Sequence, residues 1–217
     1  GVRGDMKAVV RAVLLDSEAR SLSLAGQPAF GKLTEPLIRF VQYFRAFKGH
    51  SASGYYELQF NLNGPTALNQ SPFFAPSVFN FYHPNFMPAG PLTQANLVGP
   101  EFEITNASSV AGFSSFSKYA LLPGYAQGPP PPPPFTALSP ITPDYSYYLG
   151  LTNLPGQLLD DLELVLCARC LNPTVKVQIA QAVNKIFWNE NLPGQSQERL
   201  YTALWLIINS PDFSVQR

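Results

Sequence analysis

Apolar residues recur along this chain mainly at the three- and four-residue spacing of an α-helix, and no alternating run is long enough to predict a sheet. The pattern is clearest in the C-terminal third, where three apolar stripes are separated by short connections. Proline suits the first position of a helix and serine or asparagine its cap, so Pro155, Asn172-Pro173 and Ser196 mark the three starts. Such an arrangement predicts a bundle or antiparallel cluster. The stripes are Leu158, Leu159, Leu162, Val165 and Leu166; Ile179, Ala180, Val183, Ile186 and Phe187; and Leu200, Ala203, Leu204, Ile207 and Ile208.

Three further helices are predicted in the first 120 residues. Asp5 caps the first, Thr34 the second, and Thr105 or Asn106 the third. We therefore expect a mainly α fold, a helical bundle or cluster of about six helices joined by long aromatic and proline-rich irregular loops. The stripes of these three helices are Met6, Val9, Val10, Val13 and Leu14; Leu37, Phe40, Val41, Phe44 and Phe47; and Val110, Phe113, Phe116 and Ala120.

Long irregular segments separate the helices. Proline makes up 22 of the 217 residues, a share of roughly twice the usual ~5%. The stretch 73–84 is dense in aromatic residues and bounded by prolines, which disfavour a helix just before them. We predict a packed irregular loop there, and a long loop inside a compact domain is often functional.

A second irregular segment carries six consecutive prolines, from Pro129 to Pro134, which favour a polyproline II rod. We interpret residues 121–143 as a proline-rich loop insertion within a single helical domain of residues 1–217. The rod is then a rigid spacer. The alternative is that Pro129 to Pro134 bind a partner with an aromatic groove.

The composition excludes several classes of function. Lys and Arg total 14, Asp and Glu total 14, and charged residues make up 13% of the chain against the usual ~25%. A chain this poor in cations is not a general nucleic-acid binder, and no apolar run approaches the ~20 residues of a membrane span. We expect no cofactor and no metal, because no phosphate loop or metal-ligand motif is present and two histidines cannot form a three-histidine zinc site.

Cys167 and Cys170 form a C-x-x-C motif. In thiol oxidoreductases this motif follows a strand and opens a helix, which lowers the pKa of the thiol. Here the motif ends a leucine-rich helix. We interpret the pair as two partly buried thiols, with a strained disulfide as the alternative.

His83 is the candidate catalytic residue. It lies in the aromatic loop between Tyr82 and Pro84, and a histidine acting with a carboxylate and a hydroxyl can catalyse hydrolysis. Glu101 and Asp144 are the candidate carboxylates, and Tyr82 is a further helper. No Gly-x-Ser-x-Gly motif locates a nucleophile, so a structural, hydrogen-bonding histidine is the simpler interpretation.

Four groups of residues follow one another along nearly the whole chain: 4–16 (GDMKAVVRAVLLD), 31–36 (GKLTEP), 75–82 (APSVFNFY) with 100–106 (PEFEITN), and 210–213 (SPDF). As an ordered set they resemble the C-terminal part of the large bacterial family catalogued as a domain of unknown function, number 1800.

The resemblance implies that the chain is the C-terminal portion of a larger domain from an exported bacterial protein, whose signal segment is not present in this chain. It also implies that the motifs most like a site belong to the missing N-terminal half. The proline run and the cysteine pair do not resemble family features. The family has no settled biochemical activity to transfer.

We therefore expect a structural or interaction module. Its low charge and many aromatic residues suit a surface that packs against a second copy or against the missing N-terminal half. The alternative is a small hydrolase acting on esters or glycosides around His83. Glycoside chemistry needs two carboxyl groups about 5–10 Å apart, and Glu101 with Glu103, or Asp160 with Asp161, are more simply solvated acids. The sequence leaves open whether the protein is an enzyme.

Overall fold

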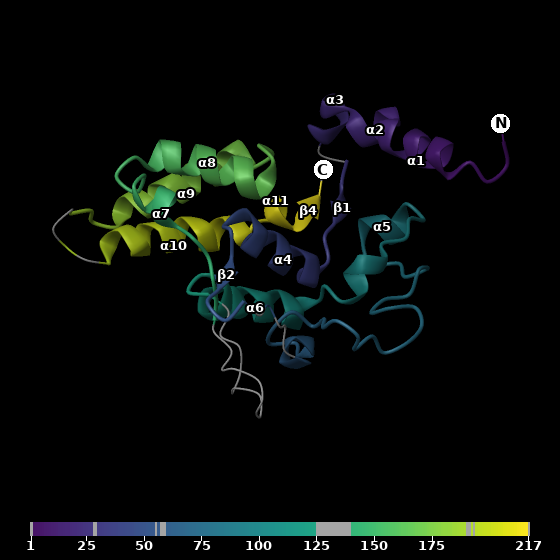
Figure 1. Cartoon of the computed structure of the whole chain (residues 1–217), viewed down its shortest axis with the longest axis horizontal. Helices are drawn as coiled ribbons and strands as arrows, with labels where there is room; N and C mark the ends of the chain where they lie inside the picture. Colours follow the sequence, from purple (N-terminus) through teal and green to yellow (C-terminus); the bar gives the residue numbers. More distant parts are fainter. Residues whose placement is uncertain are drawn as a thin grey trace. The chain divides into compact units, whose positions relative to one another are not determined.

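The computed structural model describes residues 2–27, 30–54, 56, 60–124, 140–189, 192 and 194–216. It separates into a small unit, Gly1–Lys32, and a large unit, Leu33–Gln216. The described residues are mainly helical, with six α-helices of at least ten residues, five shorter ones and only two-residue strands (Figure 1). The predicted fold class is therefore confirmed.

The elements, in chain order, are α1 (Met6–Leu15), α2 (Ser17–Arg20), α3 (Leu22–Ala25), β1 (Lys32–Leu33), α4 (Pro36–Ala46), β2 (His50–Ser51), the 3₁₀ turn η1 (Phe60–Asn63), α5 (Pro91–Gln94), the 3₁₀ turn η2 (Pro100–Glu103), α6 (Ala107–Phe116), the π-helical turn η3 (Ser117–Leu121), β3 (Ile141–Thr142), α7 (Ser146–Leu149), α8 (Pro155–Cys167), α9 (Pro173–Lys185), α10 (Gln195–Ile208), α11 (Pro211–Ser214) and β4 (Val215–Gln216).

The small unit contains the ten-residue helix α1 and the four-residue helices α2 and α3. Asp5 caps α1 as predicted, since its carboxylate accepts a hydrogen bond of 3.0 Å from the Ala8 N–H. Asp16 and Ser21 cap α2 and α3 in the same way. No residue of these three helices is buried, so the apolar stripe predicted for the first helix exists but is exposed.

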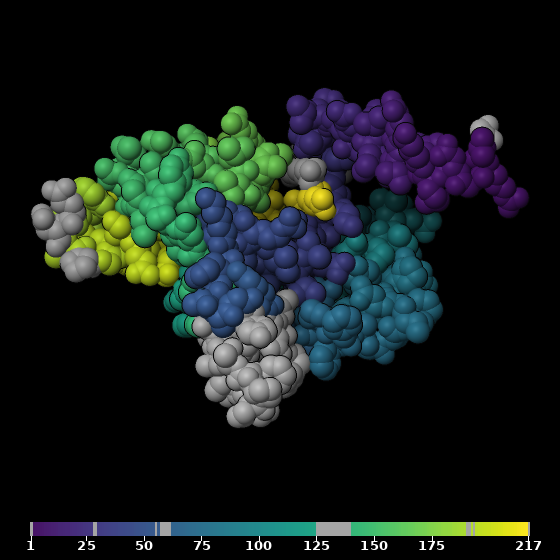
Figure 2. Space-filling view, viewed as in Figure 1, coloured from purple at the N-terminus to yellow at the C-terminus, as the bar shows by residue number. Residues whose placement is uncertain are grey.

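The core of the large unit is built around α10, which packs against α8 and α9 (Figure 1). Figure 2 shows the outer side of these helices as a continuous green and yellow surface. The predicted bundle is confirmed, as are Pro155 and Pro173 at the first helical positions and Asn172 as a cap. The apolar side chains that α8, α9 and α10 bury are those of Leu158, Leu159, Leu162, Cys167, Ile179, Val183, Leu200, Ala203, Leu204, Ile207 and Ile208.

Ser196 does not cap α10, so that prediction was wrong. The cap is Gly194, whose φ of 94° lies in the left-handed region that glycine adopts without strain. The helix therefore begins at Gln195, one residue before the serine.

An aromatic cluster on α4 packs against α8 and η3. Phe40, Phe44 and Phe47 are buried as predicted, and so is Tyr43, which the sequence did not single out. The Tyr43 hydroxyl hydrogen-bonds that of Tyr145, so each of these two hydroxyls has a partner in this apolar surrounding.

Thr34 does not cap α4, so that prediction was also wrong. Pro36 occupies the first helical position and Glu35 the cap position, where it makes no side-chain capping bond. Thr34 is buried instead, and its N–H donates to the Ser214 carbonyl at 2.8 Å.

Asn106 caps α6, as one of the two predicted alternatives. Its side chain accepts from the Ser109 N–H at 3.0 Å, and the Ser109 hydroxyl accepts from the Asn106 N–H at 3.0 Å, which forms a capping box. Helix α6 passes so close to another backbone segment that a Cβ added at Gly112 would lie 1.9 Å from the Pro65 carbonyl oxygen.

Residues 125–139, which include the run from Pro129 to Pro134, lie outside the described residues. Within the segment 121–143, interpreted above as a loop insertion, Leu121, Leu122 and Ile141 are buried in the core. Strand β3 pairs antiparallel with β2, with Ile141 opposite Ser51. In the described part of the chain, no helix has the length and apolar character to cross a membrane.

Candidate functional site

The aromatic loop is shaped by a tight turn at residues 77–80. The Phe79 N–H donates to the Ser77 hydroxyl at 3.1 Å, and the Asn80 N–H donates to the Ser77 carbonyl at 3.3 Å. Asn80 has a φ of 68°, a conformation that asparagine tolerates better than most residues. The turn exposes Val78 and Phe79 to solvent.

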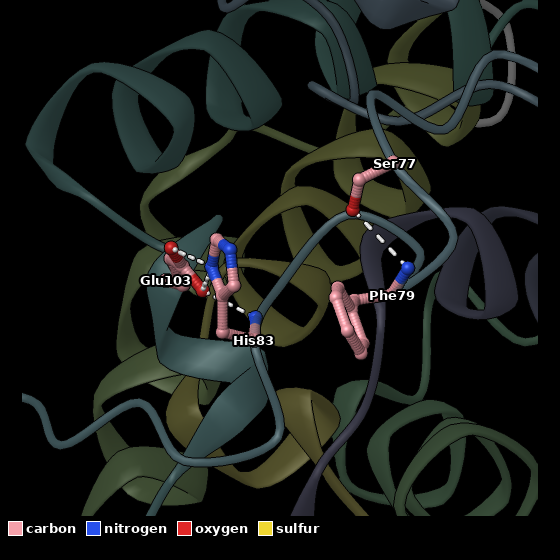
Figure 3. Close-up of polar contacts among 4 residues, drawn as sticks. All are labelled: Ser77, Phe79, His83 and Glu103. Carbon is pink, nitrogen blue, oxygen red and sulfur yellow. Dashed lines mark hydrogen bonds and ion pairs between the residues drawn. The ribbon is translucent and has the colours of Figure 1, made fainter.

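His83 follows this turn and contacts Glu103 of η2 through both its backbone and its ring (Figure 3). The His83 N–H donates to Glu103 Oε2 at 2.6 Å, and ring Nδ1 lies 2.9 Å from Oε1 and 3.2 Å from Oε2. The Gly99 N–H donates to the Phe86 carbonyl at 2.9 Å, which ties the two segments together. The loop and η2 thus hold the imidazole at a defined position.

The electrostatics of the pair favour a charged Glu103. The backbone N–H of His83, and then its ring, hold the pKa of the Glu103 carboxyl below its usual range. The His83 side chain is 62% exposed, and among the described residues its ring hydrogen-bonds only Glu103. A carboxylate on Nδ1 with an accessible Nε2 is the orientation in which a histidine can exchange a proton with a bound molecule.

Tyr82, the predicted helper, points into a different contact. Its hydroxyl donates to Glu35 Oε1 at 2.8 Å, and Glu35 Oε2 accepts a hydrogen bond from the Gln70 side-chain amide. Burial first, and then the Glu35 carboxylate, raise the pKa of Tyr82 to about 12. The negative charge of the predicted carboxylate Glu101 contributes to the same rise in the pKa of Tyr82. Tyr82 therefore fastens the loop to the start of α4.

The structure does not bring Asp144 into contact with His83. Asp144 lies at the start of α7, where its carboxylate accepts from the Ser146 N–H at 3.0 Å and from the Ser146 hydroxyl at 2.6 Å. Its own N–H donates to the Phe47 carbonyl at 2.7 Å. The hydrogen bonds from Ser146 lower the pKa of Asp144, because they favour the charged form of its carboxyl group.

The partner of His83 that sequence reasoning missed is Glu103, considered above only as half of an acidic pair. The hydroxyl of Ser77, a serine of the same loop, faces the Phe79 N–H and does not contact the imidazole (Figure 3). The described residues thus contain a histidine–carboxylate pair without a hydroxyl or thiol hydrogen-bonded to its ring. Such a pair can act on a bound molecule or on water as a base, and it can equally be a surface ion pair.

The other acidic pair considered above, Asp160 and Asp161, is engaged by other side chains. Lys176 contacts both Asp160 and Glu163, and the Tyr147 hydroxyl donates to Asp161 at 2.6 Å. These contacts separate the two members of the Asp160 and Asp161 pair.

The C-x-x-C motif lies where the sequence placed it, at the end of α8. Cys167 is buried and Cys170 half-buried, and the structure holds no disulfide between them. The Cys170 thiol donates to the Ala168 carbonyl at 3.6 Å. Within the described ranges, no group of three or more His, Cys, Asp or Glu side chains is placed to hold a metal ion.

Fold and site together define a mainly helical protein with an exposed histidine–carboxylate pair on an irregular loop. The chain belongs to the family described as Protein of unknown function (DUF1800), which matches residues 2–215. The resemblance inferred from the sequence is thereby confirmed over nearly the whole chain. Comparison with curated proteins and with solved structures gave no match.

Proposed function

We propose that the protein is an interaction module that associates with a second copy of itself through α1. The observation that carries the proposal is the exposure of a well-formed apolar stripe: Met6 is 65%, Val13 64% and Leu14 63% exposed. An amphipathic helix gains most of its stability from burying its apolar face. A stripe left open within its own unit is therefore suited to covering by a partner.

The charges of the small unit favour a second copy as that partner. The charged residues of α1 are the basic Lys7 and Arg11, whereas Asp16 and Glu18 follow at the start of α2, which ends with the basic Arg20. Asp16, Glu18 and the stripe residue Val13 line one shallow hollow in this unit. An antiparallel pairing would set the basic half of one α1 against the acidic hollow of the other, so the surface is complementary to itself.

Light scattering coupled to size exclusion tests this proposal on the whole chain across a hundredfold range of concentration. We expect a concentration-dependent dimer, at least about tenfold weaker in Val13→Glu, which adds a third negative charge to the hollow. The matched control is Val177→Glu, an exposed valine on α9. A wild-type chain that stays monomeric throughout, or a Val13→Glu chain that dimerises as well as the control, refutes the proposal.

The second candidate function is hydrolysis of an ester or glycoside at His83, and the Glu103 contact favours it. Nε2 of His83 would take a proton from water as the water attacks, while Glu103 stabilises the imidazolium that forms. A panel of chromogenic esters and glycosides should then be cleaved by wild type and by His50→Ala, and at least about 100-fold more slowly by His83→Ala. Equal rates in all three proteins, or no cleavage by any, contradict this function.

Export from the cytoplasm remains a proposal that rests on the family resemblance. Fractionation of cells that carry the complete tagged gene tests it. We expect the protein outside the cytoplasmic fraction, and its recovery with cytoplasmic enzymes contradicts the proposal.

A further inference from the structure

Arg39 is a buried cation in the first turn of α4. Its residue is only 7% exposed, and burial lowers the pKa of Arg39 to about 10, so it remains protonated at neutral pH. Removing an ion from water costs several kcal/mol unless an opposite charge or several hydrogen bonds replace the water. The partners of this guanidinium therefore decide whether the site is complete.

The partners that Arg39 has within the protein are neutral. One terminal nitrogen donates to the Ser214 hydroxyl at 3.0 Å, and the guanidinium carbon lies 4.4 Å from the centre of the Phe113 ring. The Nε–H is buried and has no hydrogen-bond partner. Among the described residues, no carboxylate forms an ion pair with Arg39, and the nearby Glu35 is engaged by Tyr82 and Gln70.

The other arginine of comparable burial provides a contrast. Arg199 is 6% exposed, and its guanidinium donates to the Ile186 carbonyl at 3.1 Å and to the Thr152 carbonyl at 2.6 Å. The fold therefore supplies backbone carbonyl acceptors to the buried guanidinium of Arg199, whose role is structural. Arg39 lacks such acceptors on its Nε–H.

A small pocket of about 110 Å³ adjoins Arg39. Its walls include Pro36, the first residue of α4, and Ser109 and Val110 in the first turn of α6. Ile208 and Asn209, at the C-terminal end of α10, line it as well, and Arg39 is the one charged residue among the described residues of its wall. The volume is well below the ~300–1,000 Å³ of pockets for drug-sized molecules, so it suits an ion of a few heavy atoms.

We propose that this pocket is a binding site for one small oxyanion, a carboxylate or inorganic phosphate, held by the Arg39 guanidinium. An oxygen of such an ion can accept a charge-assisted hydrogen bond from the guanidinium, since Arg39 lines the pocket. The bound ion would supply the negative charge that the fold leaves out. None of the residues that line the pocket belongs to the His83–Glu103 pair or to α1.

Isothermal titration calorimetry of the whole chain tests the site, with inorganic phosphate and acetate as separate titrants in a chloride buffer of matched ionic strength. We expect saturable binding of at least one titrant at one site per chain. Arg39→Met, which keeps the length of the side chain and removes its charge, should weaken that binding by at least about tenfold. Arg45→Met is the matched control, because Arg45 is exposed on the same helix, and it should bind as wild type does.

A second variant covers the case in which Arg39→Met does not fold. Val110 is 56% exposed at the rim of the pocket, so Val110→Phe should narrow the pocket and weaken binding while leaving Arg39 and the core in place. The proposal is overturned if neither titrant saturates the wild type, if Arg39→Met binds as tightly as Arg45→Met, or if Val110→Phe binds as tightly as wild type.

Discussion

Replacing Gly112 by alanine should weaken the fold, although the same change strengthens most helices. Alanine is favoured over glycine inside a helix by about 1 kcal/mol. At Gly112, however, the new Cβ would lie 1.9 Å from the Pro65 carbonyl oxygen and 2.9 Å from the Thr66 Cα. Both are backbone atoms, so no side-chain rotation relieves the overlap.

The loss of stability can be estimated from how far α6 and the segment around Pro65 must move apart to relieve the overlap. Ordinary contact requires α6 and the segment around Pro65 to move apart by on the order of 1 Å, and overpacking of this kind costs about 1–3 kcal/mol or more. The same movement disturbs the turn beside the buried residues Leu62 and Leu68. We expect a net loss of about 2–4 kcal/mol, which lowers Tm by roughly 5–15 °C in a chain of this size.

Thermal unfolding followed by far-ultraviolet circular dichroism measures the change. The control is Gly156→Ala in the first turn of α8, where an added Cβ meets no atom within 4 Å, so Tm should stay constant or rise by a few degrees. A Gly112→Ala chain as stable as the control would show that α6 does not pack against the backbone at Pro65, and would refute the reasoning.

Three further predictions concern single side chains. Leu204→Ala, at a fully buried position, should lower the free energy of unfolding by about 2–5 kcal/mol in urea titrations, whereas Leu164→Ala, at a position 46% exposed, should change it by less than about 1 kcal/mol; equal losses would contradict the assigned core. Because contact with His83 lowers the pKa of Glu103 in the folded state, its carboxylate stabilises the fold above the unfolded pKa of about 4.3 and loses that effect as pH falls through the folded pKa. The Tm difference between wild type and Glu103→Gln should thus be largest near about pH 7 and vanish toward about pH 3, and a difference independent of pH argues against the contact. Asn106→Ala should cost about 1 kcal/mol through loss of the cap on α6, and a cost near zero in the same urea titrations would show that the cap is not needed.

Helix positions could be predicted from the sequence because the signals that set them are local. Asp5, Asn106 and Asn172 each accept the backbone hydrogen bond expected of a cap. Thr34 and Ser196 did not, because a proline and a glycine nearby determined where each helix begins. Composition and spacing do not show whether a capping side chain or a nearby proline or glycine will set the first residue of a helix.

The candidate site was only partly predictable. His83 stood out as one of two histidines. Its partner Glu103 lies twenty residues further along the chain, so the contact depends on the path of the segment between them. Glu101 and Glu103 lie two residues apart in a 3₁₀ turn, where such side chains point in different directions. No property of the sequence indicated which one faces the ring. Likewise, the periodicity of α1 predicted an apolar stripe but not whether the fold would cover it.

The junction of Leu122 and Ile141 gives the large unit a convenient point for engineering. Both residues are buried, the Tyr145 hydroxyl donates to the Leu122 carbonyl at 3.1 Å, and a Cβ at Gly124 would lie 2.9 Å from the Ile141 carbonyl oxygen. The core itself thus holds the two borders of residues 125–139 close together. Because the entropy of closing a loop grows only with the logarithm of its length, by about 0.6 kcal/mol per doubling, a short linker or a guest reporter domain should be accepted between them.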